Sequence, residues 1–412
     1  MIDLRQGDCL EVMRTLPDES VHACVTDPPY GLAFMGKKWD YDVPTEEVWR
    51  EVLRVLKPGG FLLSFSGTRT YHRMVVRIED AGFEIRDMIQ WLYGSGFPKS
   101  HNVSKAIDRE AGAERERVRP LGAVARAVKD GTNALGGSWQ EEPWETAPAT
   151  DAAKQWDGWG SALKPANEPI CVARKPLIGT IAQNVLAHGC GGLNIDGCRI
   201  GTDDDTARKP SLVGDTSTPF GRGEAMGGNG HQLGRWPANV VHDGSDEVLA
   251  LFPQTGAGGF LAKRNAQGFR SDGLVQGDTP HGALSTDSGS AARFFYCAKA
   301  GQSERDKGVS GPPIEAKRTQ DGGDDTRGHP TPVNRNFHPT VKPVDLMRWL
   351  VRLVCPPGAV VIDPFMGSGT TGVACRLEGF GFIGIDRDED YVRIAQGRID
   401  AETPSLFAGA PE

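Results

Sequence analysis

The sequence predicts an α/β fold with a doubly wound, mostly parallel sheet and a large loop-rich insert. In residues 1–93 and 336–400, short apolar runs rich in β-branched residues alternate with stretches of helical spacing. This alternation is typical of parallel strands joined by right-handed helical crossovers. Residues 94–335 instead contain recurrent Gly and Pro clusters and only short apolar runs. We therefore expect two blocks that together form one sheet, an insert between them, and a tail at residues 401–412.

The N-terminal block is expected to contain four strands and three helices. Apolar periodicity and turn residues place the strands at residues 2–5, 21–26, 61–65 and 83–93, and the helices at residues 9–16, 45–56 and 69–81. Thr45 begins a capping-box pattern, and the Lys-Pro-Gly-Gly run at residues 57–60 ends that helix. Asp8 stands where the first helix begins, a position at which aspartate is a favoured N-cap.

A rigid group of hydrogen-bond acceptors follows the strand at residues 21–26. The chain continues there as Asp27-Pro28-Pro29-Tyr30. The two prolines fix φ and remove two backbone donors, so the carboxylate and the neighbouring carbonyls are held as acceptors. Such a cluster suits an amino group.

The C-terminal block centres on a strand that runs into a glycine turn and then a helix. The strand ends at Asp363, and the turn contains Gly367 and Gly369. Glycines before a helix let the backbone approach a ligand closely. A phosphate loop is disfavoured because no lysine follows Gly369, and the match to a dinucleotide fingerprint is weak by itself. A further strand ends at Asp386, about 20 residues beyond the glycines, where dinucleotide folds place an acid for ribose hydroxyls.

Together, Asp27-Pro28-Pro29-Tyr30 and the Phe365-x-Gly367-x-Gly369 turn resemble the motifs of the DNA amino-methyltransferases. That family methylates the exocyclic nitrogen of adenine or cytosine with S-adenosylmethionine. The order of the two motifs resembles its circularly permuted beta class, and the similarity covers residues 2–92 and 336–400. The resemblance implies a seven-stranded Rossmann-like methyltransferase sheet with one antiparallel strand, for which residues 168–173 are our candidate.

The resemblance also implies where the cofactor binds. Asp8 would lie beside the cofactor adenine, and Asp386 is expected to bind the ribose. Lys342 either contacts the methionine carboxylate or is a surface lysine, and the sequence leaves both alternatives open. The residues expected to bind S-adenosylmethionine are Asp8, Lys342, Asp363, Phe365, Gly367, Ser368, Gly369, Thr370 and Asp386.

The expected catalytic residues are Asp27, Pro28, Pro29 and Tyr30. An exocyclic amine is a poor nucleophile because its lone pair is conjugated with the ring. We expect Asp27 and the Pro28 carbonyl each to accept one N–H bond, which frees the lone pair for direct attack on the methyl group. Tyr30 is expected to stack on a base flipped out of the duplex, the alternative being a core aromatic.

In the family that the motifs resemble, target recognition lies between the motif blocks, so residues 94–335 are expected to read DNA. We expect one or more strands of this insert to return to the sheet, helices at residues 100–111 and 177–187, and strands following residue 239 and at 291–298. For residues 200–230 and 305–335 a long spacer is the alternative. A basic segment, offered as a DNA surface or a solvated face, comprises Lys99, Lys105, Arg109, Arg115, Arg117, Arg119, Arg126 and Lys129.

Composition narrows the class of protein further. The net charge of −8 argues mildly against a general nucleic-acid binder, which needs positive charge. Eight scattered cysteines indicate reduced thiols, and Cys190 and Cys198 lack a second pair to complete a zinc site, so no metal is expected. No apolar run approaches ~18 residues and the N-terminus already has a strand pattern, so we expect a cytoplasmic protein without a membrane span.

The leading functional hypothesis is site-specific methylation of adenine N6 in double-stranded DNA, with S-adenosylmethionine as cofactor. N4-cytosine methylation is the near alternative, because both amines present the same geometry to the motif. More distant alternatives are an RNA or protein-amide methyltransferase, in which Asn typically replaces Asp27, and a catalytically silent DNA-binding module. A homodimer is a candidate assembly, and the sequence does not decide whether a restriction endonuclease accompanies the protein.

Overall fold

The computed structural model describes residues 1–32, 41–96, 98, 100–120, 144–201, 234–255, 289–298, 304, 306–309, 336, 338 and 341–403. The spacer alternative for residues 200–230 and 305–335 falls almost entirely outside the described residues, as does most of the tail at 401–412.

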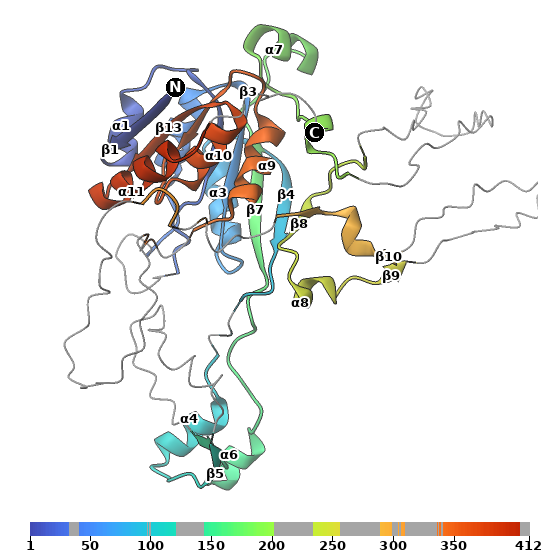
Figure 1. Cartoon of the computed structure of the whole chain (residues 1–412). Helices are drawn as coiled ribbons and strands as arrows, with labels where there is room; N and C mark the ends of the chain where they lie inside the picture. The colour runs from blue at the N-terminus through green and yellow to red at the C-terminus, as the bar shows by residue number, and fades with distance from the viewer. Residues whose placement is uncertain are drawn as a thin grey trace, which may run out of the picture.

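Within the described residues, nine strands form one large sheet in the order β1-β13-β12-β2-β3-β7-β4-β8-β11 (Figure 1). Each pair of neighbours is parallel except where β7 lies antiparallel to β3 and β4, so the predicted mostly parallel sheet and its antiparallel strand are confirmed. The strands, in sheet order, are Ile2–Gln6, Gly381–Asp386, Val360–Asp363, Val21–Thr26, Leu56–Phe65, Asn167–Arg174, Glu84–Leu92, Val240–His242 and Tyr296–Cys297.

The expected number of seven strands is wrong. The short strands β8 and β11 pair beyond β4 and extend that edge of the sheet. Both come from residues 94–335, as does β7, so the chain between the two motif blocks contributes three strands to the sheet.

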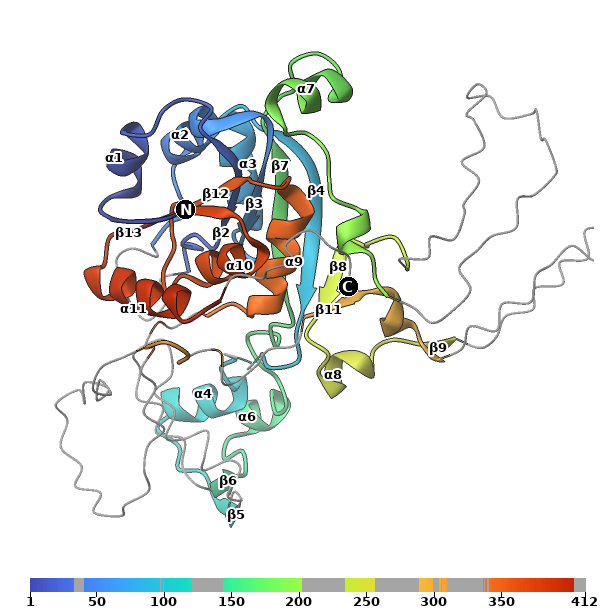
Figure 2. The same ribbon diagram turned by 45° about the horizontal axis from the view of Figure 1, so that its top comes forward.

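Helices cover both faces of the sheet (Figure 2). From Ala23 onward, successive residues of β2 point to opposite faces, because Ala23 and Val25 enter one buried cluster whereas Cys24 enters the other. An irregularity between Val21 and Ala23 places Val21 in the same cluster as Cys24. The helices of the first face are α9 Val344–Val354, α10 Thr370–Glu378 and α11 Glu389–Asp400, and those of the second are α1 Cys9–Arg14, α2 Glu46–Val55 and α3 Tyr71–Asp80.

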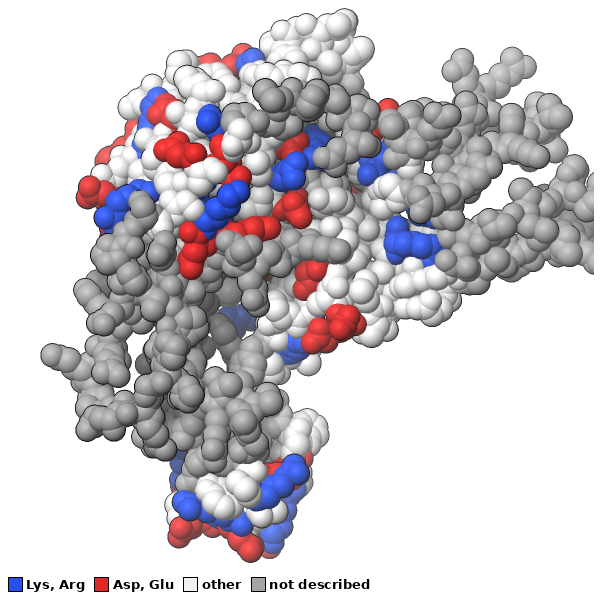
Figure 3. All heavy atoms as spheres, in the orientation of Figure 1, with Lys and Arg blue, Asp and Glu red and all other residues white. Residues whose placement is uncertain are grey.

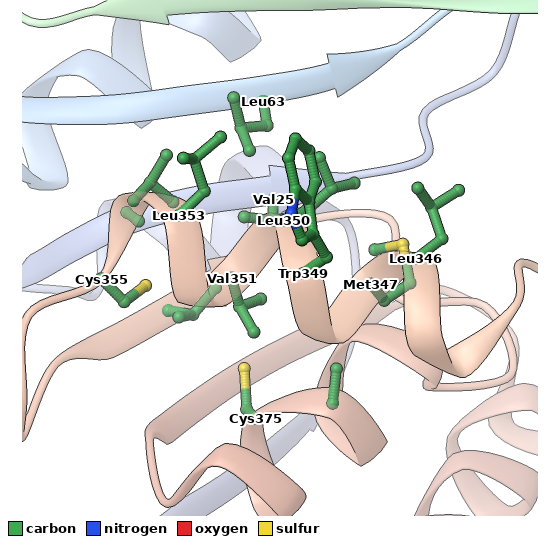
Figure 4. Close-up of a cluster of buried hydrophobic side chains, with 14 of the residues drawn as sticks. Val25, Leu63, Leu346, Met347, Trp349, Leu350, Val351, Leu353, Cys355 and Cys375 are labelled. Atoms are coloured by element: carbon green, nitrogen blue, oxygen red, sulfur yellow. The ribbon is translucent and has the colours of Figure 1, made fainter. Parts of the chain in front are cut away.

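Helix α9 lies between the sheet and α10 (Figure 4). Its buried side chains face Val25 of β2 and Leu63 of β3 on one side and Cys375 of α10 on the other. Nearly every position of α9 is buried, so the segment that leads into the glycine turn is fixed by packing on two sides. The apolar spacing of residues 344–354 in the sequence is that of an amphipathic helix, in agreement with this packing.

Three local expectations differ from the structure. Strand β3 begins at Leu56, so Lys57–Gly60 continue the strand; a Cβ on Gly60 would lie 2.8 Å from the His22 carbonyl of β2, which explains the glycine there. Thr45 is the N-cap of α2 but makes no side-chain capping bond. Residues 291–298 are not one strand, because the Ser290 hydroxyl caps a 3₁₀ turn at Ala291–Phe294 and β11 follows only at Tyr296–Cys297.

A small lobe stands away from the sheet between β4 and β7 (Figures 1 and 2). It consists of α4 Val103–Glu110, β5 Arg117–Pro120, β6 Trp144–Thr146 and α6 Asp151–Gln155. Asp108 is its buried centre: the carboxylate accepts from Ala149 N and Thr150 N, both at 3.0 Å, from the Thr150 hydroxyl at 2.8 Å and from Arg115 at 2.6 Å. Although burial opposes the shift, these hydrogen bonds lower the pKa of Asp108 to about 2.

The surface of this lobe carries both charge signs (Figure 3). Arg115 is nearly buried against Asp108, Arg119 pairs with Glu145, and the Arg117 guanidinium lies over the Trp144 ring at 5.9 Å. Arg115 therefore does not contribute to an exposed basic face, whereas Arg119 is exposed as one partner of an ion pair. The two alternatives for this segment, a DNA surface or a solvated face, stay predictions. Lys99, Arg126 and Lys129 lie outside the described residues.

The remaining described elements are short. They are α7 Ile181–His188, the 3₁₀ turn Asp196–Cys198, α8 Asp246–Leu249 and the two-stranded pair of β9 Gln254–Thr255 and β10 Gly289–Ser290. Across the helices of the described ranges, none has the length and apolar character needed to cross a bilayer.

Candidate active site

The N- and C-terminal motif blocks meet in the middle of the sheet. Strands β2 and β12 are parallel neighbours, with Ala23 opposite Val361 and Cys24 opposite Ile362. Beyond this register, the buried Thr26 hydroxyl donates to Asp363 Oδ1 at 2.6 Å, across 337 residues of chain. The acceptor motif that follows β2 and the glycine turn that follows β12 are therefore side by side.

Four acids lie at the carboxyl ends of four adjacent strands. Asp27 follows β2, Asp363 ends β12, Asp386 ends β13, and Asp8 comes shortly after β1. In open α/β sheets this edge is where ligands bind. The parallel register thus gathers carboxylates that are far apart in the sequence along one edge.

Asp27 belongs to a buried cluster of charged and polar groups. The Lys342 ammonium donates to Asp27 Oδ2 at 2.7 Å, and the Tyr30 hydroxyl lies 2.7 Å from Asp27 Oδ1. Glu168 of β7 completes the cluster, with its Oε2 at 3.2 Å from Lys342 Nζ and 3.0 Å from the Tyr30 hydroxyl. Three segments of the chain, which contribute Asp27 with Tyr30, Glu168 and Lys342, therefore meet in one cluster.

Lys342 is not a surface lysine. Only 7% of it is exposed, and its ammonium lies 4.9 Å from the centre of the Phe65 ring and 5.5 Å from that of Tyr30. Burial opposes its charge, but Asp27 and Glu168 outweigh burial and raise the pKa of Lys342. Burial, reinforced by the same two carboxylates, raises the pKa of the Tyr30 hydroxyl well above its ordinary value. The cluster thus holds Lys342 as a cation and Tyr30 as a neutral phenol.

The sequence analysis did not identify Glu168 as a site residue. It appears there only as the start of an apolar strand. An isolated acid at the start of an otherwise apolar strand is the signal that points to it, because a charge beside a buried strand needs a partner.

The glycine turn adopts backbone conformations that favour glycine. Gly367 has φ of 52° and Gly369 has φ of 78°, and a Cβ on Gly369 would lie 2.6 Å from the Ala395 Cβ of α11. The Gly367 amide donates to Asp386 Oδ2 at 2.8 Å, so the acid at the end of β13 supports the turn directly.

Ser368 and Thr370 are buried, and their hydroxyls bond to Arg398 of α11. Arg398 Nη1 lies 3.1 Å from Ser368 Oγ and 3.0 Å from Thr370 Oγ1, and it also donates to the Ser368 carbonyl at 2.7 Å. The sequence analysis missed Arg398 because nothing in the spacing of the final helix distinguishes it from a surface arginine. In this structure the two hydroxyls fix the turn on α11.

Asp363 lies beneath the turn. Besides Thr26, it accepts from the Thr371 hydroxyl at 2.6 Å and from the Phe365 amide at 3.1 Å, and only 2% of it is exposed. Burial raises the pKa of Asp363 to about 6 although these three hydrogen bonds lower it. Phe365 itself is partly buried and packs against the second core cluster.

Asp8 is the N-cap of α1, as predicted. Its Oδ1 accepts from the Leu10 amide at 3.0 Å, and its Oδ2 lies 2.6 Å from Arg387 Nη2. The Gly7 amide donates to the Asp386 carbonyl at 2.9 Å, so the loops after β1 and β13 are tied together.

Comparison with known protein families identifies the class of protein to which the chain belongs. The family model for N6/N4 DNA methylases matches residues 21–118 and 253–397, more than half of the chain. The chain belongs to this DNA methylase family.

Individual relatives match over shorter segments. The type II methyltransferase M.ScaI of Streptomyces caespitosus is 41% identical over 75 residues, which is 18% of this chain and 25% of that protein. The type II methyltransferase M2.DpnII of Streptococcus pneumoniae is 45% identical over 65 residues, 16% of this chain and 24% of that protein. The matched segments thus span about a quarter of each relative. Among solved structures, the cytosine-N4-specific PvuII DNA methyltransferase aligns over 96% of this chain and 85% of its own, with 14% identity and a TM-score of 0.43.

Proposed function

We propose that this protein is an S-adenosylmethionine-dependent methyltransferase that acts on the N6 amino group of adenine in double-stranded DNA. The observation that carries the proposal is the position of Asp27. Its carboxylate already accepts a hydrogen bond from a nitrogen, Lys342 Nζ. Asp27 also lies beside the glycine turn, because the hydrogen bond from Thr26 to Asp363 ties the end of β2 to the end of β12. Membership of the DNA methylase family supports DNA as the substrate.

The catalytic roles follow from the rigidity of the acceptor motif. Asp27 and the Pro28 carbonyl would each accept one N–H bond from the exocyclic amine, which turns its lone pair out of conjugation with the ring. Pro28 is buried and Pro29 fixes the next φ, so the backbone that carries the acceptors need not rearrange when the amine arrives. Positive charge develops on the amine nitrogen as it is methylated, and the Asp27 carboxylate stabilises it.

The acidic edge suits S-adenosylmethionine, which when bound supplies an electrophilic sulfonium methyl group. Asp386 and Asp8 would accept hydrogen bonds from the ribose hydroxyls and the adenine end of the cofactor, and the backbone at Gly367 and Gly369 can approach it closely. Phe365 would border the cofactor. Asp363, Ser368 and Thr370 would act by holding the turn, since the hydrogen bonds of their side chains run to protein groups.

The position of Lys342 changes the role that we propose for it. Its ammonium is hydrogen-bonded to Asp27, in the acceptor motif that we propose to be catalytic. We propose that it compensates one of the two carboxylate charges of the cluster, those of Asp27 and Glu168, and so orders the segment before α9. A contact with the methionine carboxylate would require its ammonium to move from the position observed here.

For Tyr30 we propose stacking on a flipped base, with its hydroxyl anchored by Asp27 and Glu168. Residues 94–335 would then contain the target-recognition region, with the lobe of α4, β5, β6 and α6 on the same side as the end of β4 (Figure 1). The order of the motifs, acceptor motif first and glycine turn last, supports assignment to the circularly permuted class.

The test is to methylate unmodified DNA with S-adenosylmethionine labelled in the methyl group, digest it and identify the labelled nucleoside. We expect N6-methyldeoxyadenosine. Label in N4-methyldeoxycytidine would show that the target base is cytosine instead of adenine, and the proposed mechanism would still hold. Label on RNA or protein, with none on DNA, would contradict the proposed function.

A further inference from the structure

The cluster around Asp27 contains more charge than the acceptor role requires. Two carboxylates, Asp27 and Glu168, face one ammonium, Lys342, and one phenol, Tyr30. Their formal charges leave one negative charge in excess. Because all four groups are at least partly buried, solvent screens this excess less than it would at the surface.

In the structure, Lys342 occupies the place that the target amine needs. Its ammonium is bound to Asp27 Oδ2 at 2.7 Å, while Tyr30 lies at 2.7 Å from the other carboxylate oxygen. Both are nitrogen or oxygen donors to the same acceptor. A substrate N–H bond to Oδ2 in the direction of Lys342 therefore requires the ammonium to withdraw.

Glu168 offers the withdrawing ammonium a second partner. Its Oε2 lies 3.2 Å from Lys342 Nζ, so a small rotation of the flexible lysine side chain exchanges one carboxylate for the other. Without that partner, displacement from Asp27 would leave a buried ammonium unpaired, which is strongly unfavourable.

We propose that Glu168 is a positioning residue that receives the Lys342 ammonium when the target amine takes its place at Asp27. In the DNA-free enzyme the ammonium satisfies the Asp27 carboxylate. On target entry it pairs with Glu168, and the Asp27 carboxylate is left with a free lone pair and the uncompensated negative charge that a methylated, positively charged amine requires. This inference rests on the proposed methyltransferase function and extends it to the selection of the target amine.

The rival explanation is that Glu168 only stabilises the end of β7. A double-mutant cycle separates the two, because an exchange partner matters only while there is an ammonium to receive. The variants are Glu168→Gln, Lys342→Met and the combination of both. Glu84→Gln is the matched control: Glu84 pairs with Arg174 of β7 at 2.6 Å, on the same sheet but outside the cluster.

We expect Glu168→Gln to lower kcat/KM for DNA by ~10-fold or more while the Kd for S-adenosylmethionine changes by less than about 3-fold. In the Lys342→Met background the same substitution should change kcat/KM by less than about 3-fold, and Glu84→Gln should match the wild type. Single-turnover measurements keep slow variants within range.

Two results would overturn the proposal: a Glu168→Gln enzyme as active as the wild type, or an equal loss in both backgrounds. If thermal unfolding shows that Glu168→Gln does not fold, Glu168→Asp takes its place, because its shorter side chain reaches Lys342 less well. We expect the same non-additivity with Lys342→Met, and additive effects of Glu168→Asp and Lys342→Met would also overturn the proposal. A wild type that transfers no methyl group to DNA would refute the proposed function itself, which distinguishes that failure from failure of the Glu168 role.

Discussion

At the scale of single residues, the site is built from carboxylates whose oxygens are already occupied by specific donors. Asp27 binds Lys342 and Tyr30, Asp363 binds two threonine hydroxyls, and Asp386 binds the Gly367 amide. Each carboxylate therefore has a structural partner as well as any ligand. Asp363 is the most enclosed of the three, and its raised pKa makes its burial measurable.

We predict that the stability of the wild type falls relative to Asp363→Asn as the pH rises from about 4 to about 6. The pKa of Asp363 is about 6 in the fold, above its ordinary value of 3.8, so the folded state binds more protons in this window and is destabilised as they leave. The shift corresponds to at most ~3 kcal/mol. Denaturant unfolding of both proteins across this range measures it, and a constant difference would show that burial does not control this carboxyl.

Sequence alone predicted the acids at the edge but not the pairs they form. Asp8, Asp27, Asp363 and Asp386 each follow or end an apolar strand, which is a local signal. Lys342 was left open between ligand and surface, and Glu168 was not recognised, because their partners lie on strands whose neighbours depend on sheet order. Side-chain pairing across distant segments has no local signature.

At the scale of elements, each long helix and strand near the site could be predicted because one periodicity dominates it. Strand β2, helix α9 and strand β13 lie where their patterns place them. The errors fall where a specific contact overrides the pattern: Gly60 lies inside β3 because it allows close approach to β2, and Ser290 caps a turn where a strand was expected. Strand β8 follows residue 239 as expected, and β11 occupies only the last part of the strand expected at residues 291–298.

The lobe of α4, β5, β6 and α6 illustrates an element held by one side chain. We predict that Asp108→Ala accelerates amide hydrogen exchange in α4 and α6 by ~10-fold or more, while β2 and β12 stay protected. The reason is that Asp108 satisfies two backbone amides, the Thr150 hydroxyl and Arg115 at once. The exposed Asp151, which pairs with Lys154 on the same lobe, provides the control Asp151→Ala.

The same carboxylate gives the lobe a pH dependence. Because the folded pKa of Asp108 is depressed to about 2, its contribution is fully present above the ordinary value of 3.8 and is lost as the pH falls toward 2. Amide protection factors in α4 and α6, which are corrected for the slower intrinsic exchange in acid, should therefore fall over this range. Unchanged protection in Asp108→Ala, or a loss equal to that in Asp151→Ala, would contradict this account of the lobe.

At the scale of the whole molecule, the fold brings two motifs from opposite ends of the chain to one sheet edge. The pairing of β2 with β12 and the bond from Thr26 to Asp363 fix their relative position. We propose separate tasks for the two motifs: Asp27 would activate the amine, and the glycine turn with Asp386 would hold the cofactor. Substitutions in the two motifs should therefore have separable effects.

The most direct test compares Asp27→Ala with Asp386→Ala in one experiment that measures both S-adenosylmethionine binding by calorimetry and methyl transfer to DNA. Asp27→Ala should keep the cofactor Kd within about 3-fold and lower kcat by at least ~100-fold, whereas Asp386→Ala should raise that Kd by ~10-fold or more. Methyl transfer by Asp27→Ala at a rate near that of the wild type would contradict the central claim that this carboxylate activates the target amine.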